Sequence, residues 1–344
     1  MRSTNRAAGR RVTLRDVAER VGITPSACSM ALADSDRISP ATKEAVRIAA
    51  AELGYVGSSA ARALRRQRAG AVALIVPTTS RHVFGHSYFM HVLSGVTSVA
   101  NDHGTQVLIA TNADKARGLT AYEQVMRSNS ADGAILTSAA INDETVRRLL
   151  DSGLPVVLIG NFPQLSRAIT VSVDDRSASR TATEHLIEVH GRRRLLHITG
   201  PLDHQTGIDR RDGFLDAVAD HGLGAQALVR EGDFSEECGR RLVEELADDF
   251  DGLVAANDDM AFGALCVLRE RGRDVPGDVA LIGFDDFGLA RVTTPAISTV
   301  AVPAEEMAAA ATERLLELVD GTAEGWTHRR MEVIFRYRAS CGCG

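Results

Sequence analysis

Apolar positions near the start of the chain recur at the spacing of a helix. Leu14, Val17, Ala18 and Val21 repeat every three or four residues with charged residues between them, which predicts a short amphipathic helix. Gly22 follows this run, and glycine adopts at little cost the left-handed turn that closes many helices. The first predicted element is therefore a helix that buries one face and ends at Gly22.

A second short helix is predicted directly after this turn. Thr24 is a suitable N-cap, and Pro25 occupies the first helical position, where the missing N–H costs nothing. The inward-facing positions of this helix are expected to be Ala27, Cys28, Ala31 and Leu32. Two short helices joined by a glycine turn are typical of a DNA-reading helix-turn-helix. A helical hairpin on the surface of an ordinary core is the alternative.

The pattern then predicts a third helix and a linker. Ser39 is the expected N-cap, Pro40 the first helical residue and Gly54 the end. The apolar positions of this helix are Val46, Ile48, Ala49 and Leu53. Tyr55 is expected to fold back on the three helices. Residues 57–70 are small, basic and only marginally helical, which indicates a linker that folds on binding.

From residue 71 onward, short apolar strands alternate with helical stretches. The predicted strands cover residues 72–76, 106–110, 134–136, 156–159, 195–198, 227–230, 252–256 and 279–283. The predicted helices cover residues 89–102, 118–129, 142–152, 176–189, 208–221, 235–247, 259–271 and 304–320. This alternation favours parallel sheets covered by helices on both faces, arranged as two lobes. Ligands of such folds bind beyond the carboxyl ends of the strands, so a cleft between the lobes is expected.

The composition is that of an ordinary globular protein. Of the 344 residues, 44% are hydrophobic and 24% are charged. No apolar run approaches the roughly 18–20 residues of a membrane span, and no apolar stretch follows the basic N-terminus, as it would in a secretory signal. The five cysteines are scattered, which favours a reducing compartment. We therefore expect a cytoplasmic protein with no membrane partner.

The charge is divided unevenly along the chain. Residues 1–70 carry 13 Lys and Arg against 6 Asp and Glu, a net charge of +7. Residues 71–344 carry the other 26 basic and 39 acidic residues, a net charge of −13. A basic head on an acidic body indicates that the head meets a polyanion. A solvated basic tail at residues 1–11 is the alternative for part of this charge.

Polar residues follow several of the predicted strands. Arg210 precedes Gly-Phe in the second lobe, Asn257 and Asp258 follow one strand, and Asp285 and Asp286 follow another. A planar guanidinium with carboxylates and an amide suits the vicinal hydroxyls of a sugar or the edge of a nucleobase. Helix N-capping is the ordinary alternative for the Asp and Asn residues.

Three parts of the chain resemble one family. The first is VTLRDVAERVGITPSACSMALADSDRISPATKEAVRIAAAELGYV, which resembles the head of the lac-repressor (LacI/GalR) family of bacterial transcription regulators. The second is AARAL at residues 60–64, which is similar to that family's hinge. The third comprises DRRDGF, AANDDMAFGAL and LIGFDDFGLARVTTPAISTV, which are similar to its effector domain. The implied fold is an all-α helix-turn-helix head and hinge, followed by a two-lobed α/β effector domain like the periplasmic binding proteins.

The resemblance implies which head residues meet DNA. Pro25, Ser26 and Met30 occupy base-reading positions in the major groove, and Thr24 and Ser29 are better placed for phosphates. Further DNA contacts are implied for Tyr55, Arg62 and Leu64, the last as a minor-groove wedge. Many relatives have arginine where this chain has Met30. Since methionine cannot make a bidentate pair with guanine, we predict an operator less dependent on guanine there.

The resemblance also implies the effector contacts. These are Tyr88, Phe89, Asn161, Arg210, Asn257 and Asp285, with the two aromatic rings as a wall of the pocket. Asp258 is expected to be a helix cap instead. The chain departs from the family at residues 80–86, which are longer by several positions, and at Gly160, where several relatives have an acid.

Enzyme and metal motifs were weighed against the same sequence. It contains no Gly-rich phosphate loop followed by Lys, no GxSxG turn and no HExxH, so no enzyme activity is expected. Cys341 and Cys343 form a CxC with no second pair nearby, which favours a disordered tail over a zinc site. His82, His86 and His91 are expected on a surface loop. We therefore predict no cofactor and no metal.

The predicted function is a ligand-responsive repressor. We expect a homodimer that binds a pseudo-palindromic operator under the control of a small molecule, with a sugar as the favoured class. The alternatives are a nucleoside or nucleobase corepressor, a sugar-transport module and a nucleoid architectural protein.

The predicted parts are a tail at 1–11, the head at 12–56, the hinge at 57–70, an N-lobe at 71–174 plus about 302–325, a C-lobe at 175–301 plus about 326–340, and a tail at 341–344. Without a terminal heptad helix, no coiled-coil tetramer is expected.

Overall fold

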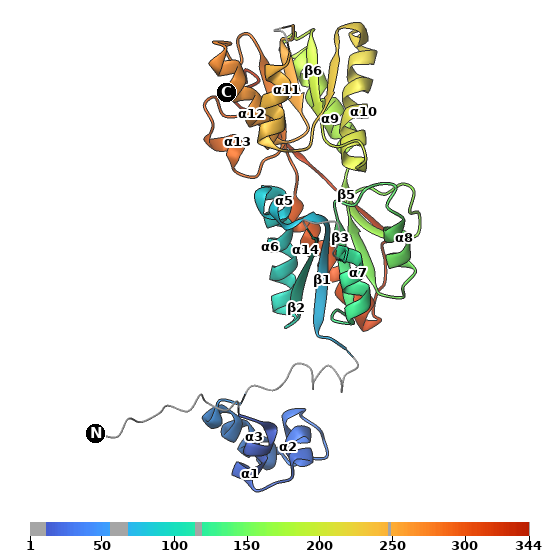
Figure 1. Cartoon of the computed structure of the whole chain (residues 1–344), viewed down its shortest axis with the longest axis vertical. Helices are drawn as coiled ribbons and strands as arrows, with labels where there is room; N and C mark the ends of the chain where they lie inside the picture. The colour runs from blue at the N-terminus through green and yellow to red at the C-terminus, as the bar shows by residue number, and fades with distance from the viewer. Residues whose placement is uncertain (1–11, 56–67, 114–118, 247–248, 344) are drawn as a thin grey trace, which may run out of the picture. The chain divides into compact units, whose positions relative to one another are not determined.

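The structure, a computed structural model, describes residues 12–55, 68–113, 119–246 and 249–343. The chain divides into two units, residues 1–69 and residues 70–344. Figure 1 labels the elements of both along the chain. Two of the predicted DNA contacts, Arg62 and Leu64, lie outside the described residues.

Three helices form the first unit: α1 (Leu14–Val21), α2 (Pro25–Leu32) and α3 (Pro40–Leu53). Each begins at a polar cap, namely Thr13, Thr24 and Ser39, and Gly22 and Gly54 end α1 and α3 in the left-handed conformation. The helices share a small core of Val17, Ala18, Cys28, Ala31, Val46, Ala49 and Ala50. The three-helix head predicted from the sequence is therefore present.

Two side chains of the head are not buried as the sequence analysis expected. Leu32 is 37% exposed and Ile48 is 51% exposed. In α3 the buried face contains Val46, Ala49 and Ala50, and a residue at position 48 points about 100° away from position 49. Leu32 is the last residue of α2, where the short helix no longer faces its neighbours.

The second unit contains two six-stranded sheets, one in each lobe. The first sheet has the strand order β11-β5-β4-β3-β1-β2, and all its pairs are parallel. Its strands are β1 (Ala71–Thr79), β2 (Gln106–Asn112), β3 (Gly133–Thr137), β4 (Val156–Ile159), β5 (Ile169–Val173) and β11 (His328–Met331). The helices of this lobe are α5 (Ser80–Gly85), α6 (Ser87–Asp102), α7 (Ala121–Ser128), α8 (Glu144–Leu150) and α14 (Ala304–Asp320).

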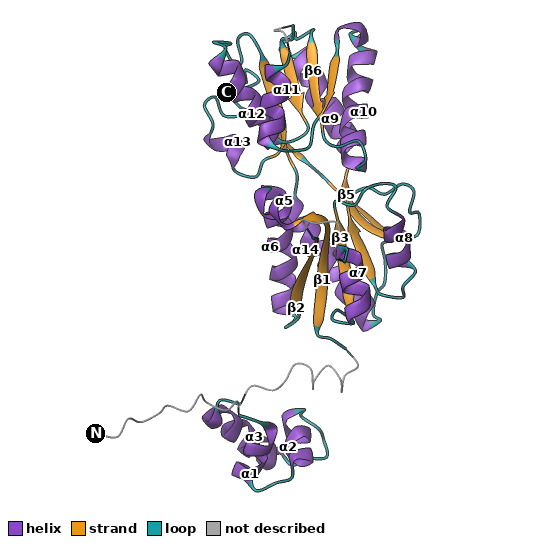
Figure 2. Cartoon of the chain, viewed as in Figure 1, coloured by secondary structure: helices purple, strands orange, loops and turns teal. Residues whose placement is uncertain are grey.

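The sheet of the second lobe has the order β12-β10-β9-β8-β6-β7 and is parallel except for β12, which runs antiparallel to β10. Its strands are β6 (Leu195–Thr199), β7 (Leu228–Glu231), β8 (Gly252–Ala255), β9 (Ala280–Asp285), β10 (Ser298–Ala301) and β12 (Ile334–Arg336). Its helices are α9 (Asp175–Glu188), α10 (Gln205–Asp220), η1 (Gly224–Gln226), α11 (Glu236–Glu244), α12 (Asp258–Glu270) and α13 (Leu289–Val292). Figure 2 shows the strands of each lobe between layers of helices.

Buried strands alternate their side chains between two cores. On β1, Leu74 packs into the core shared with α6 and α14, while Ile75 packs into the core shared with α7 and α8. In the second lobe, helices α9 and α10 cover one face and α11 and α12 the other. Because both faces of each sheet are covered, the strands read as nearly continuous apolar runs, which explains why the sequence showed most of them.

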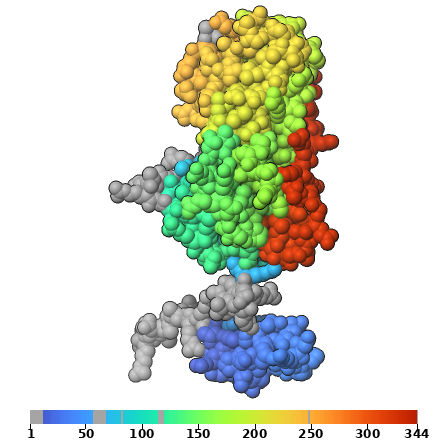
Figure 3. Space-filling view, turned by 90° about the vertical axis from the view of Figure 1, so that its right-hand side faces the viewer, coloured from blue at the N-terminus to red at the C-terminus, as the bar shows by residue number. Residues whose placement is uncertain are grey.

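The chain passes between the lobes three times: between β5 and α9, between β10 and α14, and between β11 and β12. Helix α14 packs on β3, β4 and β5, so the chain returns to the first lobe there. Figure 3 shows this C-terminal region, in red, against the first lobe, in green. The predicted passage at about residue 326 is wrong, because β11 pairs with β5 and the passage follows Met331.

Two further expectations need correction. The C-terminal end is not a disordered tail: Cys341 is fully buried, and Leu281 N–H donates to the carbonyl of Ser340 at 2.8 Å. The surface loop expected around His82, His86 and His91 is not present, since α5 occupies Ser80–Gly85 and α6 occupies Ser87–Asp102. No helix of the described residues is long and apolar enough to cross a membrane.

Candidate functional site

The N-terminal end of α2 presents polar groups to solvent in the head. Thr24, Pro25 and Ser26 are exposed there. The Thr24 hydroxyl oxygen accepts from Ala27 N–H at 3.2 Å, so its own hydrogen can still be donated to a phosphate oxygen. A helix N-terminus also attracts anions through its free N–H groups and dipole. This end of α2 can therefore meet a polyanion.

The other predicted head contacts are less accessible. Ser29 and Met30 are half-buried on α2, and Tyr55 is half-buried and packs against the small core of the head. The turn after α2 is fixed by Asp34, which pairs with Lys43 at 3.1 Å and with Arg47 at 3.2 Å. These ion pairs join the turn after α2 to α3.

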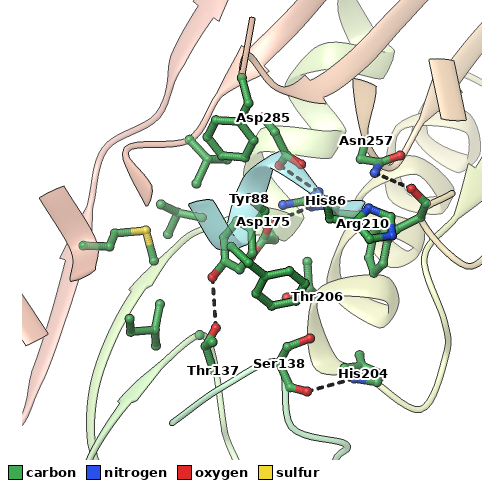
Figure 4. A pocket seen from close by; sticks show the side chains of 18 of the residues that line it. His86, Tyr88, Thr137, Ser138, Asp175, His204, Thr206, Arg210, Asn257 and Asp285 are labelled. Carbon is green, nitrogen blue, oxygen red and sulfur yellow. Dashed lines mark hydrogen bonds and ion pairs between the residues drawn. The ribbon is translucent and has the colours of Figure 1, made fainter. Parts of the chain in front are cut away.

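In the second unit, a cleft lies where the carboxyl ends of the two sheets face each other. Its volume is about 1110 Å³, including its opening to solvent. Residues that line it follow β3, β4 and β5 in the first sheet and β6, β8 and β9 in the second. The strand-end rule therefore located the cleft correctly. Figure 4 draws 18 of the side chains that line it and labels ten of them.

Arg210 is the central cation of the cleft. It lies on α10 and is only 5% exposed. Its Nε donates to Asp175 Oδ1 at 2.8 Å, and its Nη1 donates to the carbonyl of Ala256 and lies 3.5 Å from Asp285 Oδ1. The guanidinium carbon also sits 3.7 Å from the centre of the Phe284 ring. Nη2 has no hydrogen-bond partner among the described residues, which leaves two donors for a ligand.

Two carboxylates flank this guanidinium, as Figure 4 shows. Burial raises the pKa of Asp285 to about 6, against the opposing effect of Arg210. Burial likewise raises the pKa of Asp175, again opposed by Arg210. Asp285 also has a φ of +108°, a backbone conformation that side chains other than glycine rarely adopt and that is concentrated at functional sites. The cleft thus holds a strained, desolvated carboxylate beside a fixed arginine.

The roles of Asn257 and Asp258 differ from those expected. Asn257, not Asp258, is the N-cap of α12: its Oδ1 accepts from Met260 N–H at 2.9 Å and its Nδ2 donates to the carbonyl of Phe234 at 2.8 Å. Asp258 is buried and accepts from Asp286 N–H at 2.7 Å. Asn257 still lines the cleft, so a ligand contact through its remaining amide hydrogen stays a prediction.

Aromatic rings form the opposite side of the cleft. Tyr88 and Phe89 open α6 and both line the cleft, with their ring centres 5.3 Å apart in an edge-to-face arrangement. Tyr88 bonds to the Thr137 hydroxyl at 3.1 Å, and burial raises its pKa to about 12. Phe287 of the second lobe approaches Tyr88 at 6.1 Å between ring centres. An aromatic surface of this kind suits the apolar face of a sugar ring.

Several polar contacts join the two lobes across the cleft. Asn161 Nδ2 donates to Asp209 at 2.8 Å, and His204 Nε2 lies 3.2 Å from the carbonyl of Ser138. His86 Nδ1 lies 3.4 Å from Asp259. The predicted residue Asn161 therefore links the lobes in this structure as well as lining the cleft.

The sequence analysis missed several lining residues. They include His86, Thr137, Ser138, Asp175 and His204. Asp175 follows β5, whose sequence ITVSV alternates apolar and polar residues instead of forming an apolar run, so this strand, and Asp175 as a residue at its carboxyl end, were not identified. His86 was assigned to a surface loop, although it directly follows α5 and borders the cleft.

A helix-turn-helix head and two parallel α/β lobes around a polar cleft define a DNA-binding regulator with a ligand-sensing domain. Two family profiles agree with this class. "Bacterial regulatory proteins, lacI family" matches residues 13–58, and "Periplasmic binding protein-like domain" matches residues 183–341. The chain belongs to the LacI family of transcription regulators.

Curated relatives extend over nearly the whole chain. The HTH-type transcriptional regulator CelR of Thermobifida fusca is 34% identical over 322 residues, covering 91% of this chain and 93% of the relative. AscG of Escherichia coli (strain K12) is 31% identical and covers 90% and 92%. GalR of the same strain is 32% identical and covers 90% and 89%. These relatives are regulators of transcription, in agreement with the prediction that this protein is a DNA-binding regulator and not an enzyme.

Solved structures give the same result. The structure titled "transcriptional regulator CelR-cellobiose complex" matches with a TM-score of 0.72 and 31% identity, covering 96% of this chain and all of the other. A lac repressor dimer bound to operator and the anti-inducer ONPF matches with a TM-score of 0.82 at 21% identity, covering 96% and 99%. The second likeness concerns the fold, and it confirms the predicted head and two-lobed α/β architecture.

Proposed function

We propose that this protein is a cytoplasmic repressor whose operator binding is controlled by a sugar in the cleft between the lobes. The observation that carries the effector class is the arrangement around Arg210. A fixed guanidinium with free donors lies beside two carboxylates, Asp175 and Asp285, and faces the aromatic rings of Tyr88 and Phe89. Sugars offer vicinal hydroxyls to the first group and a C–H face to the second.

The titles of two similar solved structures also support a sugar as the effector. One relative's structure is titled as a complex with cellobiose, and a second structure, 22% identical, is titled with bound ribose. The residues proposed as effector contacts are Tyr88, Phe89, Asn161, Asp175, Arg210, Asn257 and Asp285. Asp175 is added to the set predicted from the sequence because it shares the guanidinium with Asp285.

Operator binding is assigned to the exposed end of α2. Thr24, Pro25 and Ser26 are the contacts that the structure leaves accessible, and Ser29 and Met30 follow on the same helix. Selection of binding sites from random DNA should return a roughly palindromic sequence. Met30→Arg should shift the selected base toward guanine, because only arginine makes the bidentate pair. An unchanged selection would refute the role of position 30.

A homodimer is proposed because a palindromic operator requires a twofold protein. Strand β2 is an edge strand of the first sheet and exposes Leu108 and Ile109 by 37% and 41%. Exposed apolar side chains on a sheet edge are a suitable place for a second copy. Sedimentation of Ile109→Asp beside the wild type tests this: a monomeric variant supports the interface, and an unchanged dimer removes it.

The effector class is tested by a thermal-shift screen of the full chain. The panel contains cellobiose, ribose, other mono- and disaccharides, and nucleosides as the alternative class. A ligand at about 100-fold excess over Kd stabilises the folded state by about 2.7 kcal/mol, which such a screen detects. A sugar shift that is lost in Arg210→Ala supports the proposal. A shift only with nucleosides, or with no compound of the panel, overturns the sugar assignment and leaves the DNA-binding assignment intact.

A further inference from the structure

Four side chains with metal-binding atoms meet at the C-terminal end of the second lobe. They are His185 in the last turn of α9, His190 in the turn that follows, and Cys341 and Cys343 beyond β12. One ligand atom from each lies within 4.8 Å of the other three. None of the four is among the described residues that line the cleft, so this cluster is separate from the proposed effector site.

The distances between these atoms fit a tetrahedral site. The two Nε2 atoms are 3.1 Å apart, Cys343 Sγ lies 3.2 Å from His190 Nε2 and 3.3 Å from His185 Nε2, and Cys341 Sγ lies 3.7 Å from His185 Nε2. Zinc bonds of about 2.0 Å to nitrogen and 2.3 Å to sulfur give tetrahedral edges of about 3.3 Å between nitrogens and about 3.5 Å between nitrogen and sulfur. The four edges given above differ from these by only a few tenths of an ångström, and the two remaining edges, from Cys341 to His190 and to Cys343, are no longer than 4.8 Å.

Hydrogen bonding within the cluster does not explain this arrangement. His185 Nε2 approaches three partners, His190, Cys341 and Cys343, at 3.1–3.7 Å. A ring nitrogen has one hydrogen or one lone pair in its plane, so it can make one good hydrogen bond. A cation at the centre of the cluster can be bound by all four ligand atoms at once.

The surrounding residues hold the four side chains in place. Gly342 has a φ of +105°, and a Cβ there would lie 3.2 Å from the ring of His190, so the turn between the cysteines requires glycine. The ring of Tyr337 stacks on that of His185 at 3.9 Å. Ser340 is buried, donates to the carbonyl of Leu281 at 2.6 Å and accepts from Ser298 N–H at 2.8 Å. Such support around the ligands is what orients a metal site.

We propose that His185, His190, Cys341 and Cys343 bind a structural zinc ion that fastens the C-terminal segment to the end of α9. Two imidazoles and two thiolates in a tetrahedron are the donor set and geometry that zinc takes in proteins. All four positions are filled by the protein, which distinguishes a structural site from a catalytic one. This proposal differs from the prediction made from the sequence, which was a disordered C-terminal tail without a metal.

The test begins with untagged full-length protein, because a histidine tag would bind zinc itself. Purified without chelator, or reconstituted with zinc sulfate, the protein should contain one zinc per chain by mass spectrometry of the metal. Replacement by Co²⁺ should give the absorption bands of tetrahedral cobalt with a thiolate-to-metal charge-transfer band. Added zinc should raise the melting temperature, and a chelator should lower it.

Two variants each remove one metal ligand: Cys343→Ser and His190→Asn. Cys343 is exposed and His190 is half-buried, so neither substitution changes the hydrophobic core. Loss of an outer-shell partner weakens metal binding by about 10- to 100-fold, so loss of a ligand should weaken it by at least about 100-fold. Cys266→Ser and His103→Asn are the matched controls, since these residues lie on α12 and at the end of α6, outside the cluster. The controls should bind zinc as the wild type does.

Three results would overturn the proposal. They are less than one zinc per chain after reconstitution, equal zinc affinity in the ligand variants and the wild type, and a Cys341–Cys343 disulfide in protein purified under reducing conditions. The effector screen does not depend on this site, so a failure here leaves the proposed function as it stands.

Discussion

The two walls of the cleft differ in chemistry. Among the described residues that line it, the first lobe supplies no Asp, Glu, Lys or Arg, but brings Tyr88, Phe89 and a row of neutral polar groups. The second lobe supplies the arginine and the carboxylates, with Arg210 held by Asp175 and Asp285. Oriented charges form directional bonds, whereas aromatic faces bind by area. The second lobe is therefore suited to select a ligand, and the first lobe to cover its apolar face.

Arg210→Ala should produce the largest effect, because it removes the cation of the charged wall. Removing one partner of a buried charge pair costs about 2–5 kcal/mol of binding, which is a loss of about 30-fold or more in affinity. It should also destabilise the second unit by about 3–5 kcal/mol, because Asp175 and Asp285 remain buried without their cation. Titration calorimetry with the sugar found in the screen and urea unfolding measure the two effects.

Arg211→Ala is the matched control for this prediction. Arg211 is the next residue of α10, and its guanidinium pairs with its neighbour Asp212 at 2.7 Å. Its removal should change the free energy of unfolding by no more than about 0.5 kcal/mol and leave the affinity unchanged. If Arg210→Ala and Arg211→Ala lower the ligand affinity equally, the loss is not specific to Arg210, and the charged wall does not depend on this cation.

Asp285 should make ligand affinity depend on pH. Burial raises its pKa to about 6, and a sugar hydroxyl donates to the ionised carboxylate, so protons compete with the ligand below that pH. Affinity should be constant above about pH 7 and fall roughly tenfold per unit well below pH 6. Because His86 and His204 also line the cleft, the profile is compared with that of Asp285→Asn. A profile shared by both proteins would assign the titration to another group.

Tyr88→Ala tests the aromatic wall and should have a smaller effect. Loss of one aromatic face costs about 1–2 kcal/mol, or about 5- to 30-fold in affinity. Tyr88→Phe keeps the ring and removes only the bond to the Thr137 hydroxyl, so its affinity should stay within about threefold of the wild type. If Phe is as damaging as Ala, the hydroxyl and not the ring binds the ligand, and the first lobe also acts through directional bonds.

The head and the cleft differ in how far the sequence predicts them. The head was predicted almost completely, because its signals are local: Thr24 and Ser39 cap their helices and Gly22 and Gly54 end them within one stretch of chain. The body's alternation of strands and helices was clear where buried parallel strands form apolar runs, whereas β5, β10, β11 and β12 were not predicted.

The cleft was predicted only where its residues follow an apolar strand. Arg210 and Asp285 were found in this way or through the family resemblance, whereas Asp175 was missed because the strand before it alternates in polarity. Only half of the C-terminal cluster is visible in the sequence, as the CxC of Cys341 and Cys343. Its histidines could not be found, since His185 and Cys343 are 158 residues apart and meet only through the order of the strands. Long-range pairings of this kind leave no local signal.

Asp258 is a third carboxylate at the charged wall, and its role differs from those of Asp175 and Asp285. Asp258 lines the cleft but is buried, and its Oδ2 accepts from Asp286 N–H at 2.7 Å. Burial, and after it the nearby charge of Asp285, raise the pKa of Asp258 well above its usual value. A carboxyl with a raised pKa in the folded state weakens that state above the unfolded pKa of about 3.9, and the penalty is complete only above the folded pKa.

Asp258→Asn should therefore stabilise the protein at neutral pH, since the amide oxygen still accepts from Asp286 N–H. We expect a gain of about 1 kcal/mol in the free energy of urea unfolding at pH 7.5, declining toward zero as the pH approaches 4. Ligand affinity should stay within about threefold of the wild type, in contrast to Asp285→Asn. A variant that loses the ligand would show that the charge of Asp258 is part of the binding wall, whereas one that is less stable at pH 7.5 would show that this charge stabilises the fold. If the ligand is lost, the second lobe binds it with Asp258 as well as with the two carboxylates beside Arg210.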